Sequence, residues 1–468
     1  MNQTIKKNKD QFVSNRELKA ISKSNVKEMT RLEKFKKRRA SELEYSTELV
    51  DENNALEIDN LHTYFFTDVG VAKAVNGVSF NVPKGSTVGV VGESGCGKSV
   101  TSLSVLQLVQ APQGQIVDGE IRFKFLDYKK DTNGKHIPIY LYDENGEPIY
   151  EPVYDKKGLP VLVNGEVQRQ PAYKRDRSGF VMFEKEEKTF NIAKMPIKQM
   201  QKIRGKEIAM IFQEPMTSLN PVFTIGYQLR EAVLQHTPGI SAYEAKARCI
   251  EMLGLVGIAM AEHVYKSYPH QLSGGMRQRV MIAMALSCNP KLIIADEPTT
   301  ALDVTIQAQI LELLRTIKTK TGTSILLITH DLGVIAEMAD FVVVMYAGRI
   351  IEKGTVYDIF DKHLQPYTIG LEKSKPVVGG KSTTLYSIPG RVPNPIDMPN
   401  HCYFYDRCNR KSPKCKEGYP ELRQISDTHS VACYTYEKEL NEYEAKKVTP
   451  KKSASKATKE EEVVVANG

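Results

Sequence analysis

The chain has 468 residues, which is enough for two or three domains whose cores need no disulfide bonds. Its net charge of +8 comes mainly from residues 1–50, where thirteen Lys and Arg stand against seven Asp and Glu, so the basicity belongs to an extension and does not indicate nucleic-acid binding. No run of about 18 apolar residues occurs, and residues 1–20 lack an apolar signal segment. We therefore expect a cytoplasmic protein that does not itself span a membrane.

Residues 1–50 are expected to form a basic extension that is partly helical or disordered. Apolar residues recur at roughly helical spacing between residues 15 and 44, beginning at Leu18 and continuing to Phe35. The apolar stripe is thin, so a solvated helix is favoured over a helix that lies on a membrane surface.

A globular α/β domain is expected over residues 51–370. Strands are predicted first in ALEIDNLHTYFF, AVNGVSFNVP and STVGVVG, and a helix is predicted over residues 99–110. A helical region follows over 227–257, and the strands EIAMIF, KLIIAD and SILLIT then alternate with helices over 274–286 and 305–320. Strands and helices in alternation imply a largely parallel, doubly wound sheet.

Three further regions differ in composition from this domain. The stretch IPIYLYDENGEPIYEPVYDKKGLPVLVNGEV alternates apolar and polar residues around Asn-Gly and Lys-Gly pairs, which is typical of β-hairpins, so a β-rich insertion is expected over residues 121–199. Residues 371–437 contain four of the seven cysteines and are expected to form a Cys-rich C-terminal domain. Residues 438–468 are polar and repetitive, and we expect them to be disordered.

The segment GESGCGKS follows the third predicted strand and fits the phosphate-binding pattern GxxxxGK[ST]. In such a loop backbone N–H groups surround the phosphates, the lysine reaches the terminal phosphates, and the last hydroxyl binds Mg²⁺. The helix that follows directs its positive end at the same anion. We therefore expect ATP and Mg²⁺ to bind at the loop residues Gly92, Ser94, Gly95, Cys96, Gly97, Lys98 and Ser99.

Polar side chains also follow three later strands. Asp296 and Glu297 come directly after KLIIA, at the strand end where open parallel sheets bind ligands. Asp296 is a candidate Mg²⁺ ligand, and Glu297 can polarise a water that lies in line with the γ-phosphate. His330 follows LLIT and can hydrogen-bond the γ-phosphate, whereas Gln213 follows IF and can contact both the metal-bound water and an oxygen.

The segment LSGGMRQR offers a second set of phosphate-binding donors at the start of a predicted helix. Ser273, Gly274 and Gly275 precede or open that helix, whose positive end would face an anion. Lys98 already serves the chain's own phosphate site. This second set of donors, Ser273, Gly274 and Gly275, is called the cradle below. We expect it to contact ATP that another subunit holds.

These segments together resemble the ATP-binding cassette (ABC) family over about residues 56–435. GESGCGKS is similar to its Walker A motif, IFQEP to its Q-loop, LSGGMRQR to its signature, LIIADE to its Walker B motif, ALD at 301–303 to its D-loop and LLITH to its H-loop. The resemblance implies the P-loop NTPase (RecA-like) fold of an ABC nucleotide-binding domain, with an antiparallel β subdomain and a helical subdomain. It also implies that Phe65, or its neighbour Tyr64, stacks on adenine, and that Gln278 of the signature belongs to the nucleotide site.

The same resemblance implies a head-to-tail dimer that closes on two ATP molecules. Ser273 and Gly275 of one chain would contact the γ-phosphate held by the other, and Glu297, His330 and Gln213 would carry out hydrolysis. The segments QPYTIGLEKSKP, SIPGRVPNP and CYFYDRC resemble the tail of the oligopeptide and dipeptide permease type of peptide importer. The implied partners are a second, similar ATPase in a heterodimer, two transmembrane permease subunits and an extracellular peptide-binding protein, with the chain peripheral at the cytoplasmic face of the cell membrane.

Four cysteines crowd the C-terminal region: Cys402, Cys408, Cys415 and Cys433. Their spacing is compatible with a zinc site, with an iron–sulfur cluster, or with reduced and unpaired thiols. The family resemblance favours a four-iron, four-sulfur (4Fe-4S) cluster among these alternatives. Disulfides are the least favoured outcome.

Two other functions are weighed against peptide import. The first is a soluble ABC ATPase that acts on nucleic acid or the ribosome, but such proteins commonly carry two cassettes or long heptad-repeat arms, and the sequence has neither. The second is a binding module that only senses ATP. The presence of both Glu297 and His330 argues against it.

Overall fold

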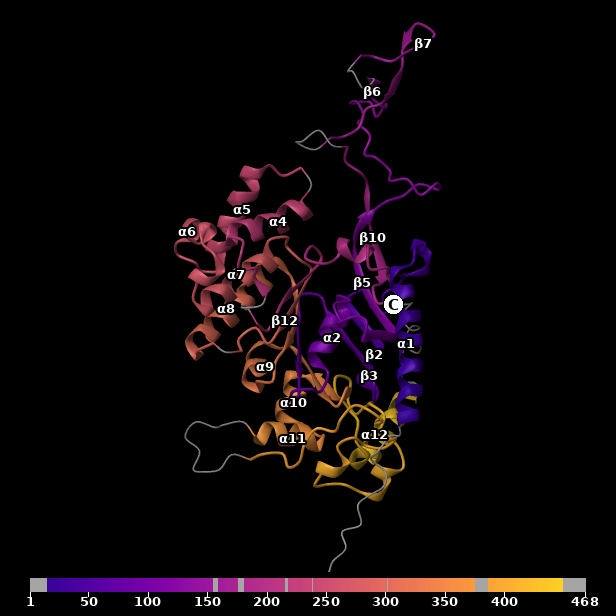
Figure 1. Ribbon diagram of the computed structural model, residues 1–468, viewed down its shortest axis with the longest axis vertical. Coiled ribbons are helices and arrows are strands. Elements are labelled where there is room, and N and C mark those ends of the chain that lie inside the picture. The colour runs from indigo at the N-terminus through magenta and orange to yellow at the C-terminus, as the bar shows by residue number, and fades with distance from the viewer. Residues whose placement is uncertain are drawn as a thin grey trace, which may run out of the picture. The chain divides into compact units, whose positions relative to one another are not determined.

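The computed structural model describes residues 15–154, 159–175, 181–214, 218–237, 239–300, 302–374 and 386–448 (Figure 1). The chain divides into two compact units, the first made of Met1–Arg349 with Val392–Met398 and the second of Ile350–Arg391 with Pro399–Gly468. Among the described helices, none is both long and apolar enough to cross a lipid bilayer.

A five-stranded antiparallel sheet forms part of the first unit, in the order β1-β10-β5-β2-β3. Its strands are β1 (Ser46–Thr47), β2 (Asn54–Thr67), β3 (Gly70–Pro83), β5 (Gly114–Tyr128) and β10 (Lys185–Asn191). The predicted strands in ALEIDNLHTYFF and AVNGVSFNVP are confirmed as β2 and β3. Short 3₁₀ helices occur at Glu42–Glu44 and Gln199–Lys202.

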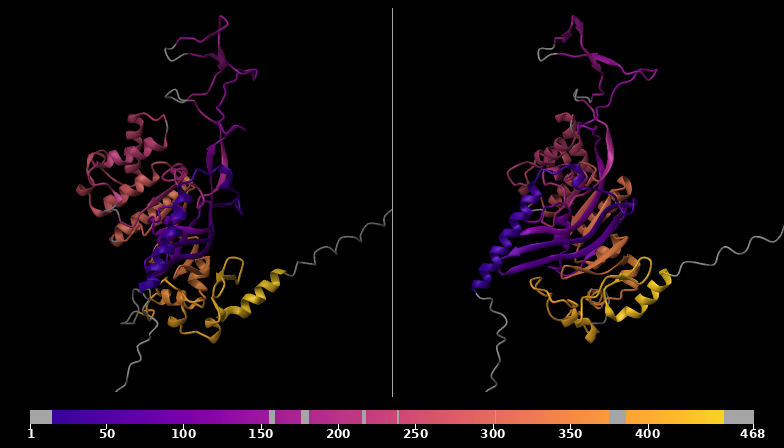
Figure 2. Two further views of the ribbon diagram at one scale, coloured as in Figure 1. Left: turned by 45° about the vertical axis from the view of Figure 1, so that its right-hand side comes forward. Right: turned by 90° about the vertical axis from the view of Figure 1, so that its right-hand side faces the viewer.

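Helix α1 (Asn15–Lys37) lies against this sheet, as both views in Figure 2 show. Its buried residues are Asn25 and Leu32, whereas most of its charged residues face solvent. The predicted N-terminal helix therefore exists, but it is packed on the domain along one face and is not solvated all round.

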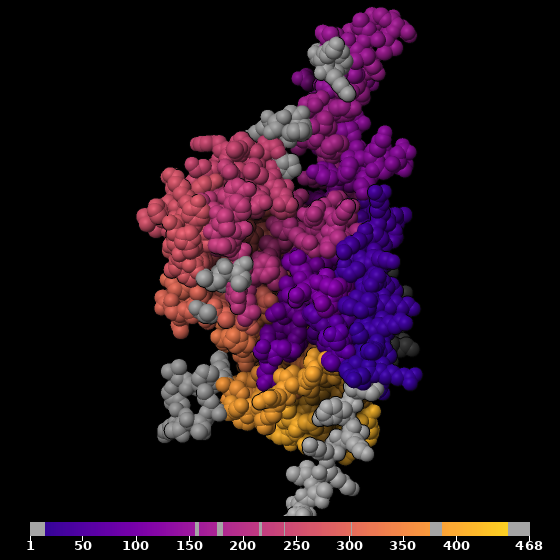
Figure 3. Space-filling view, in the orientation of Figure 1, coloured from indigo at the N-terminus to yellow at the C-terminus, as the bar shows by residue number. Residues whose placement is uncertain are grey.

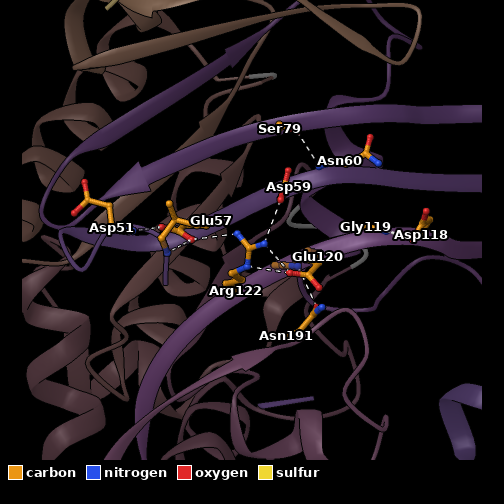
Figure 4. Close-up of polar contacts among 12 residues, drawn as sticks. Asp51, Glu57, Asp59, Asn60, Ser79, Asp118, Gly119, Glu120, Arg122 and Asn191 are labelled. Atoms are coloured by element: carbon orange, nitrogen blue, oxygen red, sulfur yellow. Dashed lines mark hydrogen bonds and ion pairs between the residues drawn. The ribbon is translucent and has the colours of Figure 1, made fainter. Parts of the chain in front are cut away.

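Arg122 of β5 ties β5 to β2 in the antiparallel sheet (Figure 4). Its guanidinium lies 2.7 Å from Glu120 Oε2, 3.2 Å from Asp59 Oδ2 and 3.5 Å from Glu57 Oε2. The buried Glu57 carboxylate also accepts the backbone N–H groups of Val50 and Asp51, each at 2.9 Å. The buried negative charge is thus paired and hydrogen-bonded, which is the condition for tolerating it inside a protein.

Five parallel strands form the central sheet of the first unit, in the order β11-β12-β13-β4-β14. They are β4 (Thr87–Val91), β11 (Ile208–Ile211), β12 (Leu292–Asp296), β13 (Ser324–Ile328) and β14 (Phe341–Tyr346). Every residue of β4, β12 and β13 is buried, as expected for parallel strands covered on both faces. The predicted parallel sheet and the strands in STVGVVG, EIAMIF, KLIIAD and SILLIT are confirmed.

Helices connect and cover the parallel strands. They are α2 (Lys98–Val105), α7 (Gly274–Leu286), α8 (Val304–Thr321) and α9 (Leu332–Met338). The helices predicted over 274–286 and 305–320 are confirmed, but the one predicted over 99–110 ends earlier. Gln107 lies within the predicted range but has a left-handed φ of 50°, which ends the helix. Its side-chain amide donates to the carbonyls of Ile192 and Met195. These tertiary hydrogen bonds replace the last helical turn.

A helical region lies between β11 and β12. It contains α4 (Ile225–His236), α5 (Ala242–Leu255) and α6 (Ala261–Lys266), followed by the 3₁₀ helix Pro269–Gln271 and α7. Thr224 and Ser241 accept a backbone N–H at the starts of α4 and α5, and Glu244 completes a capping box with Ser241. The helical prediction for 227–257 is therefore confirmed as two separately capped helices.

A β-hairpin arm extends from the ends of β5 and β10, at the top of Figure 1 and of the space-filling view in Figure 3. The ends of the predicted insertion, 121–128 and 185–191, belong to the antiparallel sheet, so the arm itself spans 129–184. Its paired strands are β6 (Tyr150–Pro152) with β9 (Arg169–Pro171), and β7 (Leu162–Val163) with β8 (Glu166–Val167). Among the described arm residues only Ala172 is buried.

A twelve-residue repeat builds much of this arm. The N–H groups of Ile137, Ile149 and Val161 donate to the carbonyls of Lys129, Leu141 and Val153 respectively, and each pair closes one turn. Within the first two turns, Asp131 and Asp143 accept backbone N–H groups two and four residues further along. The side chains at the turns therefore stabilise them locally, without a buried core.

The second unit contains β16 (Arg423–Gln424), β17 (Ser430–Val431) and all of β15 (Arg349–Thr355) except its first residue, with β17 antiparallel to both others. Its helices are α10 (Val356–Asp361), α11 (Pro366–Lys373) and α12 (Glu437–Val448), with 3₁₀ helices at Tyr405–Arg407, Pro413–Lys416 and Tyr434–Tyr436. The prediction of disorder over 438–468 is wrong for 438–448, where α12 forms and Glu444 pairs with Arg423 of β16. Residues 449–468 lie outside the described ranges. His429 Nε2 lies 2.8 Å from Oε1 of the buried Glu352, which also accepts the N–H groups of Leu364 and Gln365. These bonds join three segments of the unit.

Candidate functional site

The phosphate-loop residues connect the buried strand β4 to helix α2. Gly97 has φ 99°, and a Cβ atom there would lie 2.2 Å from the Ala74 carbonyl oxygen; at Gly92, with φ 153°, it would lie 2.3 Å from the Met345 oxygen. No side chain fits at either position, so the close approach of neighbouring backbone requires glycine. Ser94 and Gly95 are exposed on this loop, while Cys96 is buried and its burial raises the pKa of the thiol.

Lys98 opens α2 and lies across its own loop. Its Nζ donates to the carbonyl oxygens of Gly92 at 2.8 Å and Glu93 at 3.2 Å, and only 5% of the residue is exposed. Both of these acceptors are backbone carbonyls and neither is a carboxylate, so uncharged groups hold the ammonium at the loop. A phosphate that enters the loop can replace the carbonyls with a stronger, charge-assisted interaction.

Ser99 and Asp296 come together from distant parts of the sequence. Ser99 Oγ donates to Asp296 Oδ1 at 3.0 Å, which joins the start of α2 to the end of β12. Burial raises the pKa of Asp296 to about 6, against the hydrogen bond from Ser99, which lowers it. A hydroxyl and a carboxylate whose charge is poorly stabilised are suited to Mg²⁺, which prefers oxygen ligands and would supply the missing positive charge.

Glu297 is the centre of a polar cluster at the carboxyl ends of the strands. Its carboxylate accepts hydrogen bonds from Gln213 Nε2 at 2.8 Å and Thr300 Oγ1 at 3.0 Å, and its Oε1 lies 3.3 Å from His330 Nδ1. Gln213, Glu297 and His330 were predicted from the sequence to converge, and the structure brings them together. Thr300 was missed, although it lies three residues after Glu297 in the same turn.

The backbone of Glu297 is strained. Its φ of 46° lies in the left-handed region, which residues with a side chain adopt at a cost of about 1–3 kcal/mol. The Glu297 N–H donates to the Ile328 carbonyl at 2.8 Å, so the parallel sheet maintains this conformation. The strain directs the carboxylate away from the strand and into the cluster with Gln213, Thr300 and His330.

The second cradle lies at the start of α7. Ser273 caps this helix by accepting the Met276 N–H at 3.3 Å, and Ser273 and Gly274 are exposed, while a Cβ at Gly275 would lie 3.3 Å from Ile306 Cγ2. Gln278 is buried, and its amide donates to the Pro298 carbonyl at 2.6 Å, so it links α7 to the turn after Glu297. Within the described part of the chain, no hydrogen bond joins Ser273 to the phosphate loop.

The two aromatic residues proposed for the adenine lie side by side on β2. Phe65 is half-buried, and a Cβ at Gly114 would lie 2.8 Å from Phe65 Cε1, so the ring rests on a position that only glycine leaves open. The Tyr64 hydroxyl donates to Asn76 Oδ1 at 3.1 Å. Phe65 therefore has an apolar environment and Tyr64 a polar one.

The four C-terminal cysteines share one region of the second unit but form no ligand set. Cys402 N–H donates to the Cys415 carbonyl at 3.1 Å, and burial raises the pKa of Cys402 to about 12 and also raises the pKa values of Cys408 and Cys433. Throughout the described ranges, no group of three or more His, Cys, Asp or Glu is arranged to hold a metal ion. The expected iron–sulfur cluster is thus not supported by the arrangement of the described side chains.

Comparison with known proteins gives matches over most of the chain. Residues 75–150 and 172–300 match the ABC transporter family model, with the gap inside the hairpin arm, and residues 351–415 match the C-terminal region of oligopeptide/dipeptide transporters. Three Bacillus subtilis relatives are the oligopeptide transport ATP-binding protein AppD (44% identical over 384 residues, 82% of this chain and 97% of that protein), the dipeptide transport ATP-binding protein DppD (42% over 379 residues, 81% and 94%) and the oligopeptide transport ATP-binding protein OppD (41% over 377 residues, 80% and 87%).

The raised pKa of Asp296 predicts a pH-dependent cost to the stability of the nucleotide-free chain. A carboxyl whose folded pKa exceeds its unfolded pKa stabilises the fold below the unfolded pKa, about 4, and this contribution is lost as pH rises through about 6. Asp296→Asn should therefore raise the free energy of unfolding by about 1–3 kcal/mol at about pH 8. Denaturant unfolding at several pH values measures this gain.

The gain should shrink as the pH is lowered through about 6 and should be lost below about 4, where the wild-type carboxyl becomes protonated in both states. Asp361→Asn, at an exposed position of α10, is the matched control and should change little at any pH. A gain for Asp296→Asn that does not vary with pH would show that packing, not ionisation, causes it.

Proposed function

The chain belongs to the ATP-binding subunits of the oligopeptide and dipeptide ABC transporters, and we propose how its residues perform that function. It is an ABC ATPase whose ATP hydrolysis drives peptide import. The observation that carries the proposal is the meeting of Ser99 with Asp296, and of Gln213 and His330 with Glu297, at one end of the parallel sheet.

ATP binding begins at the phosphate loop. The backbone N–H groups of the loop surround the phosphates, and Lys98 exchanges the carbonyls of Gly92 and Glu93 for the terminal phosphates. Ser99 and Asp296 would hold Mg²⁺, which neutralises charge on the phosphates when it is bound. Phe65 supplies the apolar surface on which the adenine stacks.

Hydrolysis requires a water in line with the γ-phosphorus. In our proposal Glu297 hydrogen-bonds this water and takes up its proton as the new P–O bond forms and the bond to ADP breaks. Gln213 orients the carboxylate, which it already contacts at 2.8 Å, and His330 donates a hydrogen bond to the γ-phosphate. Thr300 donates to Oε2, the same carboxylate oxygen that Gln213 contacts, and so helps to hold the carboxylate in this position.

The exposed cradle at Ser273, Gly274 and Gly275 completes the site of a second subunit. We propose that this chain pairs head-to-tail with a similar ATPase, in a heterodimer, so that each cradle contacts the γ-phosphate bound by the other. Gln278 then couples the cradle to the catalytic turn of its own chain through the Pro298 carbonyl. ATP closes the pair and hydrolysis allows it to reopen.

The remaining partners follow from the transporters to which the relatives belong. We propose that two transmembrane permease subunits bind this chain at the cytoplasmic face of the cell membrane, that the segment after Gln213 transmits closure to them, and that an extracellular protein selects the peptide. The alternative of an ATPase acting on nucleic acid or the ribosome finds no support among the relatives.

Glu297→Gln tests the role of the catalytic carboxylate. Gln keeps the size of the side chain and can still accept from Gln213, but it cannot take up a proton, so the steady-state ATPase rate should fall by about 100-fold or more. ATP affinity should stay close to that of the wild type. The matched control is Glu337→Gln, which removes an exposed glutamate paired with Arg315. Undiminished hydrolysis by Glu297→Gln would refute the assignment.

Ser273→Arg tests whether the cradle acts on the partner's nucleotide. The chain carries Glu297→Gln as well, so that only the partner's site turns over, and phosphate release is measured in the assembled complex. The added arginine should lower hydrolysis there by about 100-fold, because it fills the cradle and removes its donors. Tyr357→Arg, at an exposed position of α10, should have no such effect. Normal turnover at the partner's site would contradict the shared-site arrangement.

A 4Fe-4S cluster is a separate, finer proposal. It is supported by the family resemblance and by four thiols in one region, and it would require Cys402, Cys408, Cys415 and Cys433 to move into ligand positions and lose their protons. We derive no step of ATP hydrolysis from it.

Metal analysis of the chain purified without oxygen tests the cluster. A cluster predicts about four iron and four sulfide per chain, most of which Cys415→Ser should remove, because each cysteine is one of the ligands. Cys288→Ser, outside the set, is the matched control. Zinc in place of iron would identify a zinc site, and the absence of iron, sulfide and zinc would leave reduced thiols and end the proposal.

A further inference from the structure

Helix α1 is bonded to the tip of the β2–β3 hairpin. The Asn25 side-chain amide donates to the carbonyl oxygen of Thr67 at 2.7 Å and to that of Gly70 at 3.4 Å, and Asn25 is only 7% exposed. Thr67 and Gly70 are register partners that close the hairpin. Ser22 Oγ lies 3.4 Å from Asp68 Oδ1 in the turn between them. One helix face therefore fixes both strands and the turn.

The same helix makes a second bond to the sheet near the two aromatic residues. Gln115 Nε2 donates to Glu33 Oε1 at 2.8 Å, and Gln115 is fully buried. In the register of β2 with β5, Gln115 is the partner of Tyr64, and Gly114 is the partner of Phe65. The bonds made by Asn25 and Glu33 thus lie on either side of Phe65.

A segment from the other end of the chain holds the opposite strand of this hairpin. Within the first unit, Lys73 N–H donates to the Pro395 carbonyl at 3.0 Å, and Ala72 forms a bridge with Ile396. A Cβ at Gly70 would lie 2.7 Å from Ile396 Cγ2, which shows how closely this segment packs. The hairpin is therefore supported from two sides.

We propose that α1 sets the affinity of the chain for the base of ATP, with Asn25 as a positioning residue that holds Phe65 through the β2–β3 hairpin. The inference rests on the proposed function, because it requires Phe65 to stack on adenine. Stacking depends on the position of the ring, and a two-stranded hairpin tip is marginally stable without further contacts. The buried amide of Asn25 supplies these contacts.

The test compares two ligands of the full-length chain: MgATP, and inorganic tripolyphosphate with Mg²⁺, which has no base. Asn25→Leu keeps the size of the side chain and removes the donor. Titration calorimetry should show ATP binding weakened about five- to tenfold, as for a lost buried hydrogen bond, and tripolyphosphate binding unchanged. The KM for ATP should rise in parallel, with kcat unchanged at saturation.

Two further variants and one control sharpen this test. Asn25→Gln keeps the amide and should recover part of the affinity for ATP, and Glu33→Leu, which removes the second contact, should show the same selective loss as Asn25→Leu. Val26→Leu changes the adjacent exposed position of α1 and should bind both ligands as the wild type does.

Unchanged ATP binding by both Asn25→Leu and Glu33→Leu would overturn the inference, and so would an equal loss of ATP and tripolyphosphate, which would indicate general damage to the domain. If the wild-type chain binds MgATP no more tightly than tripolyphosphate, the base adds nothing to the affinity. That result would overturn the inference and leave the phosphate site intact. A wild-type chain that binds neither ligand would refute the proposed function itself.

Discussion

The register of three buried strands determines the rest of the structure. Ile328 of β13 is the register partner of Asp296 on one side and of Val90 on the other. The residues that follow these three positions therefore emerge at the same level of the sheet: the phosphate loop after β4, Glu297 after β12 and His330 after β13. Because the strands are apolar and covered on both faces, a shift of one residue along a strand would draw the charged residues at its end into the apolar core.

The site is assembled at a cost in free energy that the apolar core offsets. Asp296 is buried where its charge is poorly stabilised, Glu297 holds a left-handed backbone conformation, and Lys98 is bonded to carbonyls of its own loop. A bound cation would stabilise the charge of Asp296, and a bound triphosphate would give Lys98 charged acceptors. The backbone conformation of Glu297 holds its carboxylate where hydrolysis needs it. Ligand binding is consequently expected to stabilise this domain strongly, since the folded chain binds nucleotide and the unfolded chain does not.

Much of this arrangement could be predicted from the sequence, because the motifs lie at the ends of strongly apolar strands. What escaped prediction depends on contacts between distant segments. The shortened helix α2 reflects the bonds of Gln107 to Ile192 and Met195. The packing of α1 includes a buried asparagine, Asn25, whose polar side chain gives no sign in the sequence that it faces the domain. The cysteines are a separate case: spacing in sequence does not determine whether four sulfur atoms face a common point, so the iron–sulfur cluster stays a proposal. Thr300 could have been noticed, because the turn after Glu297 places it within reach of the carboxylate.

The hairpin arm follows a different rule from the rest of the domain. Two of its turns close through Asp131 and Asp143, the described turns are spanned by backbone bonds across eight residues, and only Ala172 among the described arm residues is buried. Nothing in the catalytic sheet depends on how many such turns are present, since both ends of the arm are fixed where β5 and β10 pair. The arm is accordingly a module of adjustable reach: a lineage could add or remove one twelve-residue turn and alter how far the protein extends from its ATPase domain without altering its chemistry.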